Sequence, residues 1–485
     1  MGPATEPPGM TAARLRVIAV TLGLAWMLLF VLIGVAFRLQ FYGDGSAFSY
    51  GVALGENWAM HWHNLVTRIA VYLLCLAPAE GVARLSQSAV AGTTAYALLF
   101  FGAQAAGLLM TYVCDRSPAR TIFTLACAST AVVCPLVFGF PTEMWIAHAA
   151  MWPTLAASHH ARNGAAGWLA VLAAFLVLVL SHEGGLILAL AIVATTAMHG
   201  WTSRVAARAA AAFAVAVIVW LAAQAALPPD AYFAPVFARA RQHFFDPQVF
   251  TTGIFARVAL AIAGLGVSMI LLRRLSAVAA AMLSVLVVAG ALSVCWLVDP
   301  PPLHAENRYY LRTALVLLTP AFAIAAVLLA IPTTNAPPLL ARLANVLQRV
   351  ADSPRLIAFA GAALILTTVI HAVETARFVT AWSAYTAEIR HLVSDPPDAA
   401  RDAGPFVSSA RISPELQPLA WSSTTPFLSV LVAPDLSPSR LVVDPAAGYF
   451  WLTCSQSRQN EAVGQTVPKH ALALIRDYSC RYRQD

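Results

Sequence analysis

The residues from Val17 to Phe37, VIAVTLGLAWMLLFVLIGVAF, form an apolar run without a single charged side chain. At a rise of about 1.5 Å per residue, a helix of this length crosses a hydrocarbon core about 30 Å thick. Arg14 and Arg16 precede the run, and no small-residue cleavage site follows it. We therefore expect a retained signal anchor whose C-terminal end faces outward.

The composition indicates that most of the chain is embedded in a membrane. Hydrophobic residues make up 59% of the 485 positions and charged residues only 11%, which would be rare in a soluble domain. Further apolar runs predict an all-α polytopic membrane protein with about eleven transmembrane helices. After the first, they lie near residues 89–113, 121–139, 143–158, 164–181, 184–199, 206–227, 254–272, 276–298, 311–331 and 355–373. The formal net charge of +7 comes from arginines scattered in short loops, which indicates membrane orientation rather than nucleic-acid binding.

The stretch from Leu65 to Leu85 is apolar enough to be a further span, but Arg68, Glu80 and Arg84 interrupt it. We interpret it as an amphipathic helix lying in the membrane interface. This choice places the arginines of the later loops on the inner side, as the positive-inside rule requires. Those arginines are Arg116, Arg120, Arg162, Arg204, Arg208, Arg273, Arg274, Arg342, Arg349 and Arg355.

Under this topology, the remaining polar features collect on the outer side. They are Asp44 within Phe41-Tyr42-Gly43-Asp44-Gly45, Glu56, His61 and His63 within His61-Trp62-His63-Asn64, Glu143, His182, Glu183, Arg239 and Arg241 in the loop 228–252, and Arg308 and Arg312 in the loop 299–312. Ionisable residues at membrane boundaries are costly and tend to be functional. Their convergence favours a membrane enzyme with an outward-facing active site.

Residues 374–485 differ in character from the rest of the chain. Charges, prolines and the short β-prone runs 427–432 and 440–443 predict a small, extramembrane α/β domain after a membrane domain of residues 1–373. In an oxidising compartment Cys454 and Cys480 could form a disulfide, or they could remain two free thiols. The other five cysteines lie in or beside apolar segments, where packing roles are expected.

Three stretches carry a resemblance to a known family. They are Asp44 followed by His61-Trp62-His63-Asn64; Arg120-Thr121 through Pro135 to Glu143; and Arg308-Tyr309-Tyr310-Leu311-Arg312 followed by Pro320. In order and spacing they resemble the GT-C glycosyltransferases, in particular the protein O-mannosyltransferases and the lipid A aminoarabinose transferase. The Pro-Pro pair that ends the corresponding first-loop segment of that family is missing here. The residues after 330 carry no such resemblance.

The resemblance implies a bacterial inner-membrane enzyme that moves a sugar from a polyprenyl-phosphate donor to a lipid, glycan or protein acceptor at the periplasmic face, with inversion. The departing phosphate is a weakly basic anion, so no general acid is needed, but the acceptor hydroxyl must lose a proton. Asp44 would be the base, and Glu143 would orient the acceptor. Arg308 and Arg312 would bind the phosphate. No cofactor or metal is expected, because the His and acidic residues follow no zinc spacing and the family works without a catalytic metal.

Each candidate residue also has a structural interpretation. Asp44 lies in a Gly-Asp-Gly sequence that could form a turn or a helix cap, and Glu143 could simply favour a helix dipole. The other candidates have structural alternatives of the same kind: interfacial anchoring for His61, His63, Arg239 and Arg241, helix breaking for His182 and Glu183, and snorkelling for Arg308 and Arg312.

Two other functions remain open at this stage. A transporter or flippase of a lipid-linked glycan would also be polytopic, but it should show internal repeats and midplane polar residues, and we detect no repeat. A glycan polymerase or ligase would use arginines of a large outer loop, such as Arg239 and Arg241. A glycosyltransferase is the function that the sequence favours.

Overall fold

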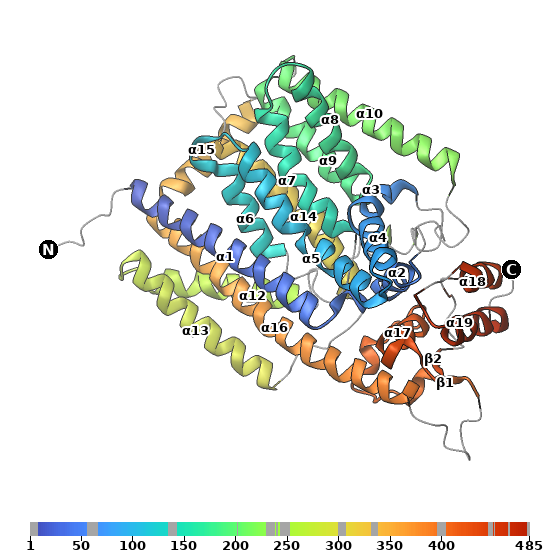
Figure 1. The fold of residues 1–485 in the computed structure, drawn as a ribbon. Helices are drawn as coiled ribbons and strands as arrows, with labels where there is room; N and C mark the ends of the chain where they lie inside the picture. Colours follow the sequence, from blue (N-terminus) through green and yellow to red (C-terminus); the bar gives the residue numbers. More distant parts are fainter. Residues whose placement is uncertain are drawn as a thin grey trace.

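The computed structural model describes residues 8–55, 66–133, 143–200, 202–228, 238, 241–242, 253–298, 307–330, 338–394, 404–444, 450, 452–463 and 466–482. Within these ranges the chain is almost entirely helical, and its long helices pack side by side in a bundle (Figure 1). The bundle helices are α1 (Pro8–Ala36), α5 (Ala89–Cys114), α6 (Thr121–Val133), α7 (Met144–His160), α8 (Ala165–Val179), α9 (Gly184–Thr196), α10 (Arg204–Ala226), α12 (Gly253–Leu271), α13 (Ala277–Val298), α14 (Asn307–Ala330) and α16 (Pro354–Ser394). A further helix, α15 (Pro338–Asp352), connects α14 to α16.

A helix coincides with each of the predicted apolar runs, but not all of these helices are long. Six helical segments of the described chain are long and apolar enough to cross a membrane: Ala13–Ala36, Val66–Ser86, Ala89–Cys114, Arg204–Ala226, Ala277–Val298 and Pro354–Ser394. The apolar helices that include α6, α8, α9, α12 and α14 are shorter in the described residues. The structure therefore supports an all-α membrane protein, while the number of about eleven spans stays a prediction.

Small residues allow the central helices to approach each other closely. A Cβ atom at Gly107 of α5 would overlap the carbonyl group of Ala149 in α7. Membrane helices associate through such small-residue contacts, because lipid chains are as apolar as the helix surfaces and give no hydrophobic driving force. The α5–α7 pair forms the centre of the bundle, and α1 packs against α5, α6 and α16.

One end of the bundle, here called the cap end, carries the polar features discussed below. It is the end at which α1 finishes and a short helix, α2 (Asp44–Ala53), begins. Residues 404–482, here called the C-terminal region, also pack at this end, on the right of Figure 1. The cap end thus combines segments from the beginning and the end of the chain.

The segment 66–86 is helical but irregular, and both of its ends lie at the cap end. It consists of η3 (Val66–Arg68), α3 (Ile69–Val71), the π-helical turn η4 (Tyr72–Leu76) and α4 (Ala77–Ser86). The N–H of Ala70 donates to the carbonyl of Leu180 at 3.0 Å, while Arg84 donates to the carbonyl of Gly55. Because both ends contact the same end of the bundle, this geometry favours the predicted interfacial helix, although length and composition alone would permit a span.

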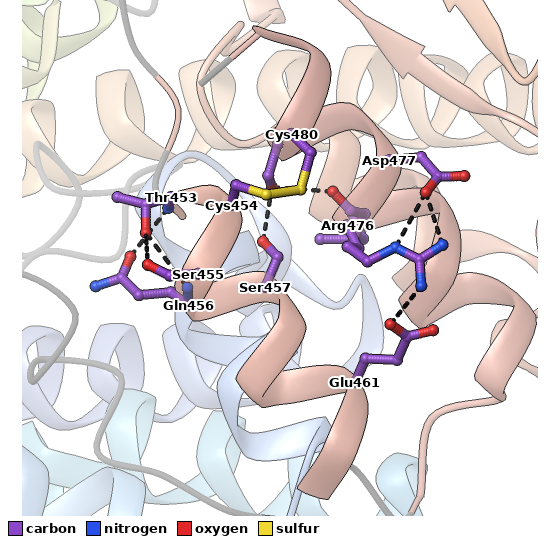
Figure 2. Close-up of a disulfide and its surroundings, with 11 residues drawn as sticks. Thr453, Cys454, Ser455, Gln456, Ser457, Glu461, Arg476, Asp477 and Cys480 are labelled. Carbon is purple, nitrogen blue, oxygen red and sulfur yellow. Dashed lines mark hydrogen bonds and ion pairs between the residues drawn. A yellow bond between two sulfur atoms is a disulfide. The ribbon is translucent and has the colours of Figure 1, made fainter. Parts of the chain in front are cut away.

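The C-terminal region contains two short parallel strands and three helices. β1 (Phe406–Ser408) pairs with β2 (Leu441–Val443), and the helices are α17 (Thr425–Val432), α18 (Cys454–Val463) and α19 (Lys469–Tyr482). Cys454 and Cys480 form a disulfide that joins α18 to α19 (Figure 2). Beside it, Arg476 forms ion pairs with Glu461 at 2.6 Å and Asp477 at 2.8 Å.

One expectation for this region is wrong. The run 427–432, predicted as a strand, lies in the helix α17, and Pro426 is compatible with its first turn, where the missing N–H costs nothing. Short apolar runs do not distinguish a strand from a buried helix by periodicity. The helix α16 continues through the predicted domain boundary at residues 373/374 to Ser394, and the division into two domains stays a prediction.

Candidate functional site

A buried arginine joins two carboxylates at the cap end. The Nη1 atom of Arg68 donates to Oε1 of Glu143 at 2.7 Å. Its Nε and Nη2 atoms donate to the two carboxylate oxygens of Glu183 at 3.2 Å and 2.9 Å. The side chains of the three residues are 13%, 3% and 15% exposed, respectively. We call Arg68, Glu143 and Glu183 the charged triad.

Helix starts place the two glutamates beside each other. Glu143 is the N-cap residue of α7, and Glu183 is the N-cap residue of α9. The two helices approach closely because position 184 is a glycine: a Cβ there would lie 2.6 Å from Sδ of Met144. The positive ends of both helix dipoles therefore point toward the triad, which favours ionised carboxylates there.

The ionisation of Glu183 follows from its partner. Burial raises the pKa of the Glu183 carboxyl, but the positive charge and hydrogen bonds of Arg68 outweigh it, and the resulting pKa is about 2. The neighbouring His182 acts as a cap, because its Nδ1 atom accepts the N–H of Gly184 at 3.0 Å. That nitrogen also lies 3.6 Å from the Glu183 carboxylate. Glu183 is therefore ionised throughout the physiological pH range.

Asp44 lies in a tight turn directly after α1. Its predecessor Gly43 has φ 59° and ψ −132°, a conformation that disfavours any residue with a Cβ. The hydroxyl of Ser49 donates to the carbonyl of Gln40 at 3.1 Å and so fixes the turn against α2. Asp44 is the first residue of α2 and is only partly buried, so its carboxyl lies at a helix N-terminus close to solvent.

Tyr96 of α5 is buried, with 1% of its side chain exposed. Asp44 and Glu143 are both near enough to act on it electrostatically. The two acidic residues from separate helix connections are thus at the same end of the bundle, as the sequence predicts. The structure also brings Glu183 and His182 to this place.

Several other candidates lie outside the described residues. These are Glu56, His61, His63 and Arg239, and the side chains of Arg308 and Arg312. Arg241 is described and exposed, and it makes no ion pair with the described residues.

The backbone of α14 nevertheless approaches the triad. A Cβ atom at Gly184 would lie 3.2 Å from a methyl group of Val316. Arg312 is one helical turn before Val316, and the helix begins at Asn307. Val316 of α14 therefore lies beside the start of α9, and position 312 is about 6 Å of helix rise from it, toward the start of α14.

An apolar groove follows the bundle surface. It has a volume of about 590 Å³ and is lined by Leu74, Cys75, and residues 98–110 of α5, 146–154 of α7 and 170–177 of α8. Leu74 lies six residues after Arg68, Ile146 three residues after Glu143, and Val177 six residues before Glu183. Each charged residue is therefore within about two helical turns, along the chain, of a residue that lines the groove, and this apolar lining is suited to a hydrocarbon chain.

A polar cluster in the bundle centre is satisfied without any charge. Nε2 of Gln104 donates to the carbonyl of Trp145 at 3.0 Å, so Oε1 of Gln104 accepts a hydrogen bond from the Nδ1–H of His148 at 3.1 Å. Nε2 of His148 then accepts from Ser129 at 3.2 Å and from Trp152 at 3.5 Å. Since both ring nitrogens have partners when the ring is neutral, this cluster joins α5, α6 and α7 structurally.

Sequence reasoning missed two residues of the site. Arg68 entered it only as an interruption of an apolar stretch, and Tyr96 had no role. An arginine between Thr67 and Ile69 is a signal in itself, because an arginine in an apolar segment needs a carboxylate or a phosphate partner. The partner could not be identified, since it lies 75 and 115 residues away in sequence.

Comparisons with known proteins assign no family to this chain. No family model, curated protein or solved structure matches this chain. Among the described residues, no three His, Cys, Asp or Glu side chains are grouped to hold a metal ion.

Proposed function

We propose that this protein is a membrane glycosyltransferase that moves a sugar from a polyprenyl-phosphate donor to an acceptor hydroxyl. The observation that carries the proposal is the cap-end arrangement: Asp44 and the charged triad lie at the same end of the bundle, and an apolar groove follows the bundle surface along α5, α7 and α8. An amphiphilic donor needs both parts, a polar site for its sugar phosphate and an apolar surface for its chain.

The groove between α5, α7 and α8 would hold the prenyl chain. Its only polar side chain with a hydroxyl is Thr154, which donates to the carbonyl of Ala150 at 2.6 Å and is thereby satisfied. The sugar phosphate would then lie at the cap end. Arg312 and Arg308, near the start of α14, would bind the phosphate, because the charge of Arg68 is already shared by two carboxylates.

In the proposed reaction, Asp44 accepts the proton of the acceptor hydroxyl. The acceptor oxygen forms a bond to the anomeric carbon while the bond from that carbon to the phosphate oxygen breaks. The electron pair leaves with the polyprenyl phosphate, and attack from the opposite side inverts the anomeric centre. Glu143 and Glu183, both hydrogen-bonded to Arg68, orient the acceptor or stabilise developing positive charge on the sugar.

Transfer of a radiolabelled sugar by purified protein tests this proposal. Defined polyprenyl-phosphate sugars serve as donors, and wild type is compared with Asp44→Asn, for which we expect a loss of at least about 100-fold in kcat. Asp435→Asn is the matched control, because Asp435 is exposed, lies in the C-terminal region and has φ 50°, which Asn tolerates. Full activity of Asp44→Asn would remove Asp44 from the mechanism. No turnover with any donor, together with lipid translocation in vesicles, would favour a flippase.

A further inference from the structure

The C-terminal region touches the backbone of the proposed base. The hydroxyl of Thr424, which lies just before α17, donates to the carbonyl oxygen of Gly43 at 2.9 Å. Thr424 is 1% exposed, so water does not compete for this bond. The two residues are 381 positions apart in sequence. The contact therefore depends on the folded C-terminal region.

That carbonyl belongs to the peptide group that joins Gly43 to Asp44. The peptide group is planar, so fixing its oxygen also fixes the N–H of Asp44 and limits the direction of the Asp44 side chain. Glycine allows many backbone angles at position 43. The Gly43 carbonyl also accepts the N–H of Ser46 at 3.1 Å, so the Thr424 hydroxyl is a second, long-range partner of the same oxygen.

Further contacts keep Thr424 in place relative to the turn. Phe427 of α17 packs on Tyr50 of α2 with ring centroids 4.9 Å apart, and Thr466 donates to the carbonyl of Ala53. Trp382 of α16 donates to the carbonyl of Phe37 at 3.0 Å, directly before the turn. Both sides of the Asp44 turn are thus bound to segments that lead into the C-terminal region.

We infer that Thr424 is a positioning residue, which sets the orientation of Asp44 through the carbonyl of Gly43 and makes the C-terminal region part of the active site. The inference rests on the proposed function for its catalytic consequence. The geometric part stands on the hydrogen bond itself. A displacement of a catalytic group by about 1 Å can lower the rate by up to about 100-fold.

Three variants test the catalytic part. Thr424→Val removes the hydroxyl at nearly constant volume, and we expect kcat to fall about 10-fold or more with KM changed less than about twofold. Thr424→Ser keeps the hydroxyl and should retain more than about half of the wild-type kcat. Ser422→Ala is the matched control: it removes a hydrogen bond of 2.8 Å to Asp444 in the same turn without touching Gly43, and it should leave kcat unchanged. Wild-type kcat in a folded Thr424→Val protein, or equal losses in Thr424→Ser, would overturn the inference.

A labelling experiment tests the geometric part without turnover. Asp44→Cys is combined with Thr424→Val or with Thr424→Ser, and the rate of reaction with a small, membrane-impermeant thiol reagent is measured on the purified, full-length protein. We expect the rate in the Thr424→Val background to differ at least about threefold from that in the Thr424→Ser background. Equal rates would contradict positioning by Thr424. If wild type transfers no sugar but the rates differ, the proposed function fails and the positioning role stands.

Discussion

Arg68 decides the electrostatics of the cap end at the scale of single residues. One guanidinium serves two carboxylates with three donors, a geometry that lysine cannot reproduce because its ammonium is a single point. The arrangement pairs two acids with one cation in a largely buried place. Loss of the arginine would leave them without compensation.

Replacing Arg68 with Gln should therefore lower stability strongly. Removing one member of a buried ion pair leaves an uncompensated charge, which costs about 3–5 kcal/mol. Arg476→Gln is the control, because Arg476 is 32% exposed in its ion pairs with Glu461 and Asp477, and exposed pairs contribute about 0–1 kcal/mol. Thermal unfolding in detergent measures both. Equal shifts in the two variants would contradict a special role for the triad.

Glu183 should contribute to the pH dependence of the free energy of unfolding. Its pKa is about 2 in the folded protein, below the ordinary value of 4.5 for a glutamate, so ionised Glu183 stabilises the fold above about pH 4.5. That contribution is lost as the pH falls from 4.5 toward 2, because the unfolded chain then binds the proton first. Glu183→Gln should remove this part of the acid dependence in unfolding measurements between pH 7 and 3. An unchanged acid slope in the variant would show that other groups cause it.

At the scale of elements, the groove between α5, α7 and α8 makes a prediction about chain length. A Cβ atom at Gly102 meets no atom within 4 Å, so a larger side chain can enter the groove without disturbing the helices. Gly102→Leu should raise KM for long-chain polyprenyl donors about 10-fold and leave short-chain donors nearly unchanged.

Gly290→Leu provides the control for the groove. Gly290 lies in α13 and also has open space around its Cβ position, but it does not line this groove. Its kinetic constants should equal those of wild type for both donor lengths. Equal effects of the two leucines would indicate a general response of the membrane surface rather than binding in the groove.

The elements also show what the sequence can and cannot predict. Apolar run length located the helices of the bundle well, because hydrophobicity and helix length are local properties. The same criterion failed for the run 427–432, which forms α17, since a short buried segment depends on its tertiary surroundings. The helix near residues 66–86 was predicted, but its π-helical turn was not, because no local pattern of composition indicates such a turn.

The site itself was predictable only in part. Asp44 and Glu143 could be selected because they are isolated acids next to apolar runs, and topology placed them on one side. The other features involve residues far apart in the chain: the hydrogen bonds of Arg68, the proximity of Tyr96 to Asp44 and Glu143, and the hydrogen bond of Thr424. These pairings depend on packing that no local pattern encodes.

At the scale of the whole molecule, the disulfide between Cys454 and Cys480 stabilises the C-terminal region. It closes a loop with a sequence separation of 26, for which a contribution of about 3 kcal/mol is expected. The double variant Cys454→Ser with Cys480→Ser should make α18 and α19 more sensitive to protease. Reductant should have the same effect on wild type and none on the double variant. Protease resistance that is unchanged by reduction would contradict this stabilising role.

The unbroken helix α16 connects the bundle to the C-terminal region over 41 residues. Its later turns hold Trp382, bonded to Phe37, and Arg390, which donates to the carbonyl of Val432 in α17 at 2.9 Å. Because a helix rotates about 100° per residue, inserting a single alanine after position 373 would turn these two side chains to a different face of the helix. The rotation of α16 about its own axis thus determines where the C-terminal region packs, and with it where the hydroxyl of Thr424 contacts the Gly43 carbonyl beside Asp44.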